Sequence, residues 1–215
     1  MNEKVHALIN QQINTEFYSA YLYLNFSNYF EEVGLDGFAN WYKIQAQEER
    51  DHAMLFYQYL QNENQKVTFE AIDKPDLNAA CHMDVLKAGL EHEKYVTSLI
   101  NDIYSEAYEA KDFRTMQFLD WFVKEQGEEE TNAKNLISKI ELFGSDPKSL
   151  YIECLALRRI HADIRCLCRR DHGAGCHRKC RYHTHCDHGC FARISFLHVV
   201  TLIFLPHFFP SGYSA

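Results

Sequence analysis

The sequence predicts an all-α protein, a four-helix bundle with one long crossover connection. Three observations predict this fold. The first 145 residues contain one proline, Pro75, and few glycines. Apolar residues recur there at the spacing of an amphipathic helix in four successive segments. Two of the three connections between these segments are short, and the middle one is long and polar. We therefore expect helices at residues 3–31, 36–61, 80–109 and 112–142.

The connections predict how the four helices are arranged. "EVGLDG" separates the first two helices and "EAKD" the last two, so each of these pairs is expected to be antiparallel. The middle link, of about 18 residues, could reach roughly 60 Å at about 3.3 Å per residue. A helix of about 27 residues is roughly 40 Å long. The link can therefore run the length of the bundle, which makes the second and third helices parallel.

Each helix has an inward stripe at alternating steps of three and four residues. The stripes are Ile9, Ile13, Glu16, Ala20, Tyr23 and Ser27; Phe38, Tyr42, Gln45, Glu49, His52, Phe56 and Tyr59; Leu86, Leu90 (or Gly89), Glu93, Val96, Ile100 and Ile103; and Leu119, Phe122, Gln126, Glu129, Ala133, Leu136 and Ile140. Every stripe is mostly apolar or aromatic, and every stripe is interrupted near its middle by a glutamate. The alternative, in which the stripes are shifted and the acids exposed, needs the same coincidence four times.

Four buried glutamates need a counter-charge. Burying an unpaired ionised carboxylate costs several kcal/mol, and no Lys or Arg lies on the stripes. Two divalent cations would balance the four charges, and carboxylate and imidazole ligands suit iron, manganese or zinc. Glu49-x-x-His52 places both side chains on one helix face, so one helix can chelate one ion. The sequence therefore predicts a two-metal centre at mid-bundle.

The two halves of this centre are unequal. Where the second helix has Glu49-x-x-His52, the fourth has Gln126-x-x-Glu129. We infer one tighter and one looser metal site, and a loose site suits an iron that leaves. A second acidic cluster is offset from the first by one residue on two helices, and its members are Glu48, Glu125 and Glu128. The alternative for this second cluster is an ordinary solvated face.

Residues 1 to about 151 resemble a bacterial non-haem ferritin. The resemblance is carried by "NTEFYSAYLYL" (14–24), "FANWYKIQAQEERDHA" (38–53), "LEHEKYVTSLIN" (90–101) and "FLDWFVKEQGEEE" (118–130). It implies a ferritin-like fold and a ferroxidase centre without haem. By this resemblance, the ligands of the first iron are Glu16, Glu49 and His52, those of the second are Glu93 and Glu129 with Glu49 bridging and Gln126 nearby, and those of a third site are Glu48, Glu125 and Glu128. Tyr23 and Trp121 would lie beside the centre.

The resemblance also implies a function in iron storage. The protein would oxidise Fe(II) with dioxygen or peroxide and deposit ferric mineral inside a homo-oligomeric shell of 24 subunits. One rival is a di-iron peroxidase of the rubrerythrin type, which would want a second Glu-x-x-His and usually a Cys-x-x-Cys site. The fourth helix has Gln126-x-x-Glu129 in place of the former, and the sequence has no Cys-x-x-Cys. Another rival is a bundle that buffers metal without turnover.

Composition excludes several other classes of protein. The net charge of −8 disfavours a nucleic-acid partner. The longest apolar run, residues 194–206, is shorter than the roughly 20 residues that span a bilayer, so no membrane association is expected. The polar N-terminus indicates a cytoplasmic location. His6, His82 and His92 are not expected to bind metal, and Cys81 is expected to be a packed thiol.

The composition changes abruptly near residue 151. Residues 151–215 contain 9 Lys/Arg and 4 Asp/Glu, a balance of +5, which leaves 13 and 26, a balance of −13, for the first 150. Seven of the eight cysteines also lie after residue 151. We therefore divide the chain into a bundle, 1–151, and a Cys/His/Arg-rich tail, 152–215. For "CHRKCRYHTHCDHGC" (176–190), a zinc site, adventitious metal binding and a poorly ordered tail stay open, and a reading-frame shift or spurious extension would explain the change.

Overall fold

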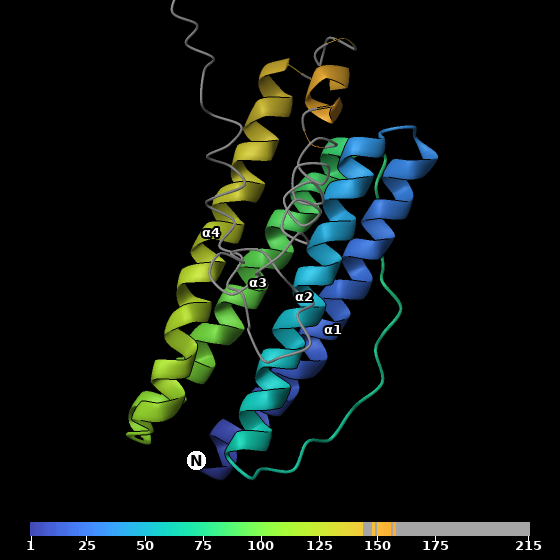
Figure 1. The fold of residues 1–215 in the computed structure, drawn as a ribbon. Coiled ribbons are helices and arrows are strands. Elements are labelled where there is room, and N and C mark those ends of the chain that lie inside the picture. The colour runs from blue at the N-terminus through green and yellow to red at the C-terminus, as the bar shows by residue number, and fades with distance from the viewer. Residues whose placement is uncertain (144–147, 149, 156, 158–215) are drawn as a thin grey trace, which may run out of the picture. The chain divides into compact units, whose positions relative to one another are not determined.

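Four long helices make up most of the structure, a computed structural model that describes residues 1–143, 148, 150–155 and 157. The helices are α1 (Glu3–Glu32), α2 (Asp36–Asn62), α3 (His82–Glu109) and α4 (Phe113–Phe143), and Figure 1 shows them aligned along a common direction. The predicted helix bounds agree with these to within two residues. No helix among the described residues is long and apolar enough to cross a membrane.

The chain divides into two units, Met1–Arg159 and Ile160–Ala215, and every described residue lies in the first. After α4, residues 150–155 and 157 are also helical. Cys154 in this segment is buried, and its Sγ accepts a hydrogen bond from the Gly37 amide at the start of α2, at 3.1 Å. The tail cysteines and histidines from residue 161 onward lie outside the described residues, and the division at residue 151 stays a prediction.

The helices begin and turn at residues that suit those positions. Asn2 is the N-cap of α1, and its Oδ1 accepts a hydrogen bond of 2.7 Å from the Val5 amide. Gly34, in the turn between α1 and α2, has φ of +75°, which an L side chain rarely adopts. Asp112 precedes α4, and its Oδ1 accepts from the Thr115 amide at 3.2 Å. These local signals make the two short turns that pair α1 with α2 and α3 with α4.

The long crossover, residues 63–81, runs along the bundle beside α1 (Figure 1). Asn10 anchors it by accepting from the Thr68 amide at 2.8 Å and donating to the Thr68 carbonyl at 2.9 Å. One turn further along α1, Asn14 donates to the carbonyl of Ala71 at 3.3 Å. The crossover therefore returns the chain to the end at which α2 began, and α2 and α3 are parallel, as predicted.

Aromatic residues fill the core on both sides of a polar middle. Near one end of the bundle, the ring of Phe30 stacks on Phe38 and Tyr42 at centroid distances of 5.2 and 5.6 Å. Toward the other end, Phe56 stacks on Phe122 at 4.1 Å. The predicted inward residues are buried apart from Ala20, Tyr59, Leu90 and Ala133, which are partly buried, and Gly89 is the buried alternative to Leu90. The core thus encloses the mid-helix glutamates.

The prediction for Cys81 is wrong, because its thiol is exposed rather than packed. Cys81 is the N-cap residue of α3 and precedes the first helical turn. Its backbone amide donates to the carboxylate of Asp84 at 3.1 Å. The residue therefore belongs to the end of the helix, where the inward stripe has not yet begun.

Candidate metal centre

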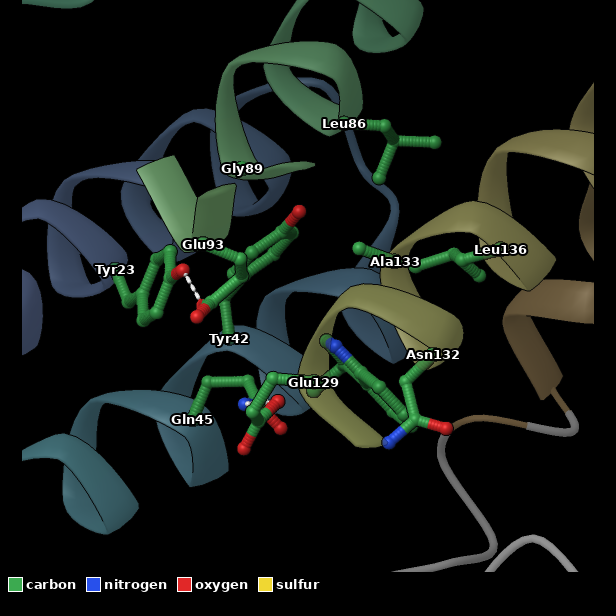
Figure 2. A pocket seen from close by; sticks show the side chains of 11 residues that line it. Tyr23, Tyr42, Gln45, Leu86, Gly89, Glu93, Glu129, Asn132, Ala133 and Leu136 are labelled. Atoms are coloured by element: carbon green, nitrogen blue, oxygen red, sulfur yellow. Dashed lines mark hydrogen bonds between the residues drawn. The ribbon is translucent and has the colours of Figure 1, made fainter. Parts of the chain in front are cut away.

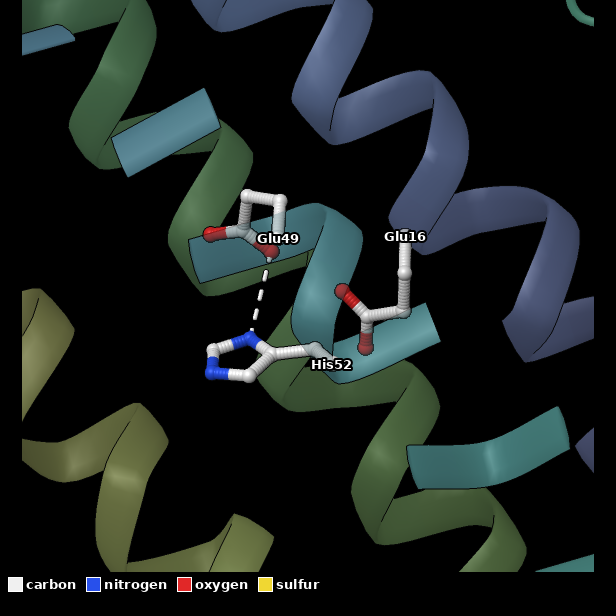
Figure 3. Close-up of side chains that lie close together, drawn as sticks. All are labelled: Glu16, Glu49 and His52. Carbon is white, nitrogen blue, oxygen red and sulfur yellow. Dashed lines mark ion pairs between the residues drawn. The ribbon is translucent and has the colours of Figure 1, made fainter. Parts of the chain in front are cut away.

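Glu16 of α1 and Glu49 and His52 of α2 converge in the middle of the bundle (Figure 3). Each offers one ligand atom, and these atoms lie within 4.8 Å of one another. His52 Nδ1 is 3.4 Å from Glu49 Oε2, which follows from their spacing of three residues on one helix face. All three side chains are buried. Over the described part of the chain, this is the one group of three or more such ligands that is already drawn together.

Glu93 of α3 and Gln126 and Glu129 of α4 make up the second half of the centre, and all three are buried. Gln126 Nε2 donates to Glu93 Oε2 at 3.1 Å, and the Tyr23 hydroxyl donates to Glu93 Oε1. Gln45 Nε2 donates to Glu129 Oε2 at 3.0 Å. The second half is therefore held by hydrogen bonds to neutral side chains, whereas the first half is a compact ligand cluster.

The four glutamates share an environment that opposes ionisation. Burial raises the pKa of Glu16, Glu49, Glu93 and Glu129 above the ordinary glutamate value. Neighbouring carboxylates raise these pKa values further: that of Glu16 through Glu49, and those of Glu49 and Glu129 through Glu93. In the metal-free protein these groups therefore retain protons that exposed glutamates lose, and a bound cation would displace them.

The donor set fits divalent metal ions. Glu16 Oε2 and Glu129 Oε1 are buried and have no hydrogen-bond partner among the described residues. Within that same part of the chain, no Lys or Arg forms an ion pair with any of the four glutamates. Carboxylate oxygens with one imidazole are ligands that Fe(II), Mn(II) and Zn(II) accept. Cations would satisfy both the unpaired oxygens and the excess negative charge.

A second group of acids adjoins the centre on α2 and α4. Burial raises the pKa of Glu48 to about 8, with a smaller contribution from the charge of Glu125, while His52 opposes the rise. Glu125 is buried too, and burial followed by the charge of Glu128 raises its pKa. Glu128 lies 3.2 Å from Lys124 Nζ. Glu125 is therefore buried rather than on a solvated face, Glu48 and Glu128 are partly buried, and the three acids predicted as a cluster interact electrostatically.

The sequence matches a known protein family. A family model described as a ferritin-like domain matches residues 6–143. The chain belongs to the ferritin family. Bacterial non-heme ferritin from Campylobacter jejuni is 36% identical over 152 residues, covering 71% of this chain and 91% of that protein. Bacterial non-heme ferritin from Bacteroides fragilis is 37% identical over 144 residues, covering 67% and 91%. A probable bacterial non-heme ferritin-like protein from Haemophilus influenzae is 34% identical, covering 71% and 92%.

Solved ferritin structures agree with the fold. An open-pore ferritin from the hyperthermophilic archaeon Archaeoglobus fulgidus is 38% identical and superposes with a TM-score of 0.71, covering 73% of this chain and 97% of that one. A form of the same protein engineered to be closed gives the same identity and TM-score and covers 96% of that chain. The predicted four-helix, ferritin-like fold with its long crossover is thereby confirmed.

Two aromatic residues expected beside the centre contact candidate ligands. Tyr23 is buried and donates its hydroxyl hydrogen to Glu93. Burial raises the pKa of Tyr23 well above its usual value, and the charge of Glu93 adds to the rise, so the phenol stays protonated. The ring of Trp121 meets that of His52 edge to face at 5.4 Å. Tyr23 thus lies against the second half of the centre and Trp121 against the first.

Three residues near the ferritin centre had no role in the sequence prediction. Gln12 Nε2 donates to Glu16 Oε1 at 2.8 Å, and its position one helical turn before Glu16 was the available signal. His92 Nε2 lies 2.7 Å from Ser19 Oγ, and burial lowers the pKa of His92 to about 4. The third is Gln45, which bonds Glu129. The contacts of His92 and Gln45 were not recognisable from one helix alone, because each depends on a neighbouring helix.

The lack of a metal role for His6, His82 and His92 stays a prediction. His6 and His82 are partly exposed, and neither belongs to the cluster of Glu16, Glu49 and His52. His92 lies one residue from Glu93, but its ring packs near Tyr23, at a centroid distance of 5.8 Å. The ring of His92 therefore packs against Tyr23, whose hydroxyl donates a hydrogen bond to Glu93.

Proposed function

We propose that this chain stores iron, and that it oxidises Fe(II) at a two-iron ferroxidase centre before depositing the ferric product. The observation that carries the proposal is the set of four buried glutamates with raised pKa values, none of which forms an ion pair with a Lys or Arg in the described part of the chain. Glu16 and Glu129 each have one oxygen without a hydrogen-bond partner there. Such a set is costly unless cations occupy it. Family membership and the names of the bacterial non-heme relatives support iron as the cation.

The two irons are substrates held in unlike sites. Glu16, Glu49 and His52 would bind the first Fe(II), because their ligand atoms are already together. The second Fe(II) would take Glu93 and Glu129, with Glu49 as the bridging carboxylate. Gln126 is neutral and hydrogen-bonded to Glu93, so it would add little to the second site. The second iron is therefore held more weakly and leaves more readily.

The residues also supply the chemistry of oxidation. Two Fe(II) ions at close range can together give two electrons to dioxygen, and with two protons this yields two Fe(III) and one hydrogen peroxide. Carboxylate ligands are hard donors and stabilise Fe(III) relative to Fe(II). Binding of Fe(II) displaces protons from glutamates whose pKa values are raised, so protons are released at the site. Tyr23 would orient Glu93 through its hydroxyl.

Iron would then leave through the second acidic group. Glu48, Glu125 and Glu128 adjoin the centre and would form a third, transit site for the ferric product. We further propose that copies of the chain assemble into a shell of 24 subunits around the mineral, as the ferritin resemblance implies. The bundle at residues 1–151 would provide this activity, and the cytoplasmic location stays a prediction.

Aerobic addition of Fe(II) tests the proposal. Glu49→Ala removes the bridging ligand, so we expect fast oxidation to disappear while slow mineral deposition continues. The control is Glu91→Ala, since Glu91 is exposed on α3 and pairs only with Lys94 at the surface. Stopped-flow absorbance measures the oxidation rate, and iron analysis of the purified protein measures retention. Wild-type kinetics in Glu49→Ala would show that the ligands are wrongly assigned.

The same experiment separates the rival functions. Rapid oxidation with hundreds of irons retained per shell would support iron storage. Rapid turnover without retention would instead indicate a peroxidase of the rubrerythrin type. Tight metal binding with no oxidation above that of buffer would indicate a bundle that buffers metal without turnover.

A further inference from the structure

Two of the proposed iron ligands have the same pattern of hydrogen bonds. In Glu16, Oε1 accepts a hydrogen bond of 2.8 Å from Gln12 Nε2, whereas Oε2 is buried and has no partner among the described residues. In Glu129, Oε2 accepts a hydrogen bond of 3.0 Å from Gln45 Nε2, whereas Oε1 is buried and likewise has no partner there. Figure 2 shows the side chain of Gln45, from α2, beside that of Glu129, from α4. Each carboxylate therefore has one oxygen held by an amide and one oxygen left over.

The pattern suits a carboxylate that is oriented toward a cation. Buried polar atoms normally have hydrogen-bond partners, so two buried carboxylate oxygens without one indicate that something else binds them. Glu16 also offers a ligand atom to the cluster with Glu49 and His52. The donors on the occupied oxygens are neutral amides. An amide orients a carboxylate without adding a positive charge, whereas a Lys or Arg in its place would compete with a bound cation.

Glu93 shows that the pattern is not common to every glutamate of the centre. Its Oε1 accepts from the Tyr23 hydroxyl and its Oε2 accepts from Gln126 Nε2 at 3.1 Å. Glu93 therefore has no oxygen without a partner, unlike Glu16 and Glu129. The pattern picks out one glutamate in each half of the centre, with a different glutamine bonded to each.

We propose that Gln12 and Gln45 are positioning residues for the two irons, Gln12 for the first and Gln45 for the second. Each amide holds one oxygen of its glutamate and thereby directs the other oxygen to the metal. Hydrogen bonds to the ligands of a metal site orient those ligands and raise the affinity of the site. The inference rests on the proposed function, which makes Glu16 and Glu129 ligands of different irons. Both glutamines act through a carboxylate, and neither binds the metal itself.

Gln12→Met and Gln45→Met test the proposal, because methionine removes the amide donor and keeps an unbranched side chain of similar length. The matched controls are Gln11→Met on α1 and Gln47→Met on α2, where the glutamine side chains are exposed. Calorimetric titration with Zn(II) measures the dissociation constants of the two ions. The visible absorption of bound Co(II) reports the ligands at each site, and thermal unfolding of the metal-free protein reports its stability.

The losses should be specific to one site. Gln12→Met should weaken binding of the first Zn(II) about tenfold and leave the second unchanged, because the freed carboxylate of Glu16 can turn away from the metal. Gln45→Met should weaken the second about tenfold and leave the first unchanged. The Co(II) bands should change only at the site whose affinity falls, and both control variants should match the wild type.

Two results would overturn the proposal. If both variants bind Zn(II) and Co(II) as the wild type does, the two amides only fill the core. If either variant weakens both ions equally, with unchanged Co(II) bands and a lower Tm, the bundle has loosened as a whole and no ligand has lost its orientation. Zn(II) and Co(II) bind without oxidation. The positioning roles can therefore fail in a protein that oxidises Fe(II) rapidly, and the ferroxidase function can fail in a protein whose variants show the site-specific losses.

Discussion

Glu48→Gln should stabilise the metal-free protein, and by an amount that depends on pH. Burial raises the pKa of Glu48 from 4.5 to about 8, and its Oε2 has no hydrogen-bond partner in the described residues. Because the folded pKa is above the unfolded one, Glu48 contributes most to stability below pH 4.5. That contribution is lost as pH rises from there toward 8. The glutamine variant has no such titration.

The magnitude follows from linkage. At pH 7 the folded protein must hold a proton that the unfolded chain has released, which costs about 3 kcal/mol at roughly 1.4 kcal/mol per pH unit. The amide of the new glutamine would lack part of its hydrogen bonding, which would cost about 1 kcal/mol of stability. We therefore expect a net gain of about 2 kcal/mol at pH 7 and close to zero at pH 5. At about 2–4 °C per kcal/mol, this is a rise in Tm of roughly 4–8 °C at pH 7.

Thermal unfolding of metal-free protein at pH 5, 6 and 7 measures this difference. Glu91→Gln is the matched control, since its carboxylate is exposed on α3, and its Tm should follow the wild type at every pH. The reasoning fails if the Tm difference between Glu48→Gln and the wild type is the same at pH 5 and pH 7, because a titrating buried carboxyl cannot produce a constant difference. A Tm of Glu48→Gln below that of the wild type at pH 7 would also contradict the reasoning.

Four further substitutions test separate parts of the structure. A Cβ at Gly37 would lie 1.7 Å from the carbonyl oxygen of Cys154, so Gly37→Ala should displace the helical residues after α4 and lower the Tm. Gly127→Ala meets nothing within 4 Å and should raise stability by about 0.5–1 kcal/mol, measured by the same unfolding experiment. Tyr23→Phe removes the hydrogen bond to Glu93, a proposed ligand of the second site, and calorimetry should show the second Zn(II) binding about tenfold more weakly with the first unchanged. Phe56→Ala removes a fully buried ring and should lower the free energy of unfolding by about 3–5 kcal/mol, measured by denaturant unfolding.

Helix boundaries and inward faces could be predicted because both depend on local sequence. Gly34 and Asp112 mark the short turns, and a stripe at steps of three and four points to one side of a helix whatever its neighbours are. Glu49 and His52 could be paired on the same ground, since residues three apart share a helix face. The length of the middle link was enough to predict the parallel arrangement of α2 and α3.

Contacts that cross between helices were beyond such reasoning. Gln45 had been placed on an inward stripe, but its bond to Glu129 depends on the register of α2 against α4. His92 was not expected to bind metal, and its hydrogen bond to Ser19 and its ring contact with Tyr23 both depend on how α3 packs against α1. Cys81 was expected to pack because thiols usually do, and the end of α3 exposes it instead.

The sequence by itself determined the types of the candidate ligands, their positions near the middle of each helix, and the inequality between Glu49-x-x-His52 and Gln126-x-x-Glu129. These follow from residue identity and helical period, which need no partner helix. Only the tertiary structure decided that Glu16, Glu49 and His52 converge while Glu93 and Glu129 are held by neutral side chains. The burial depth, the side-chain rotamers and the register between helices depend on how the helices pack together. They therefore cannot be predicted from the inward residues of a single helix.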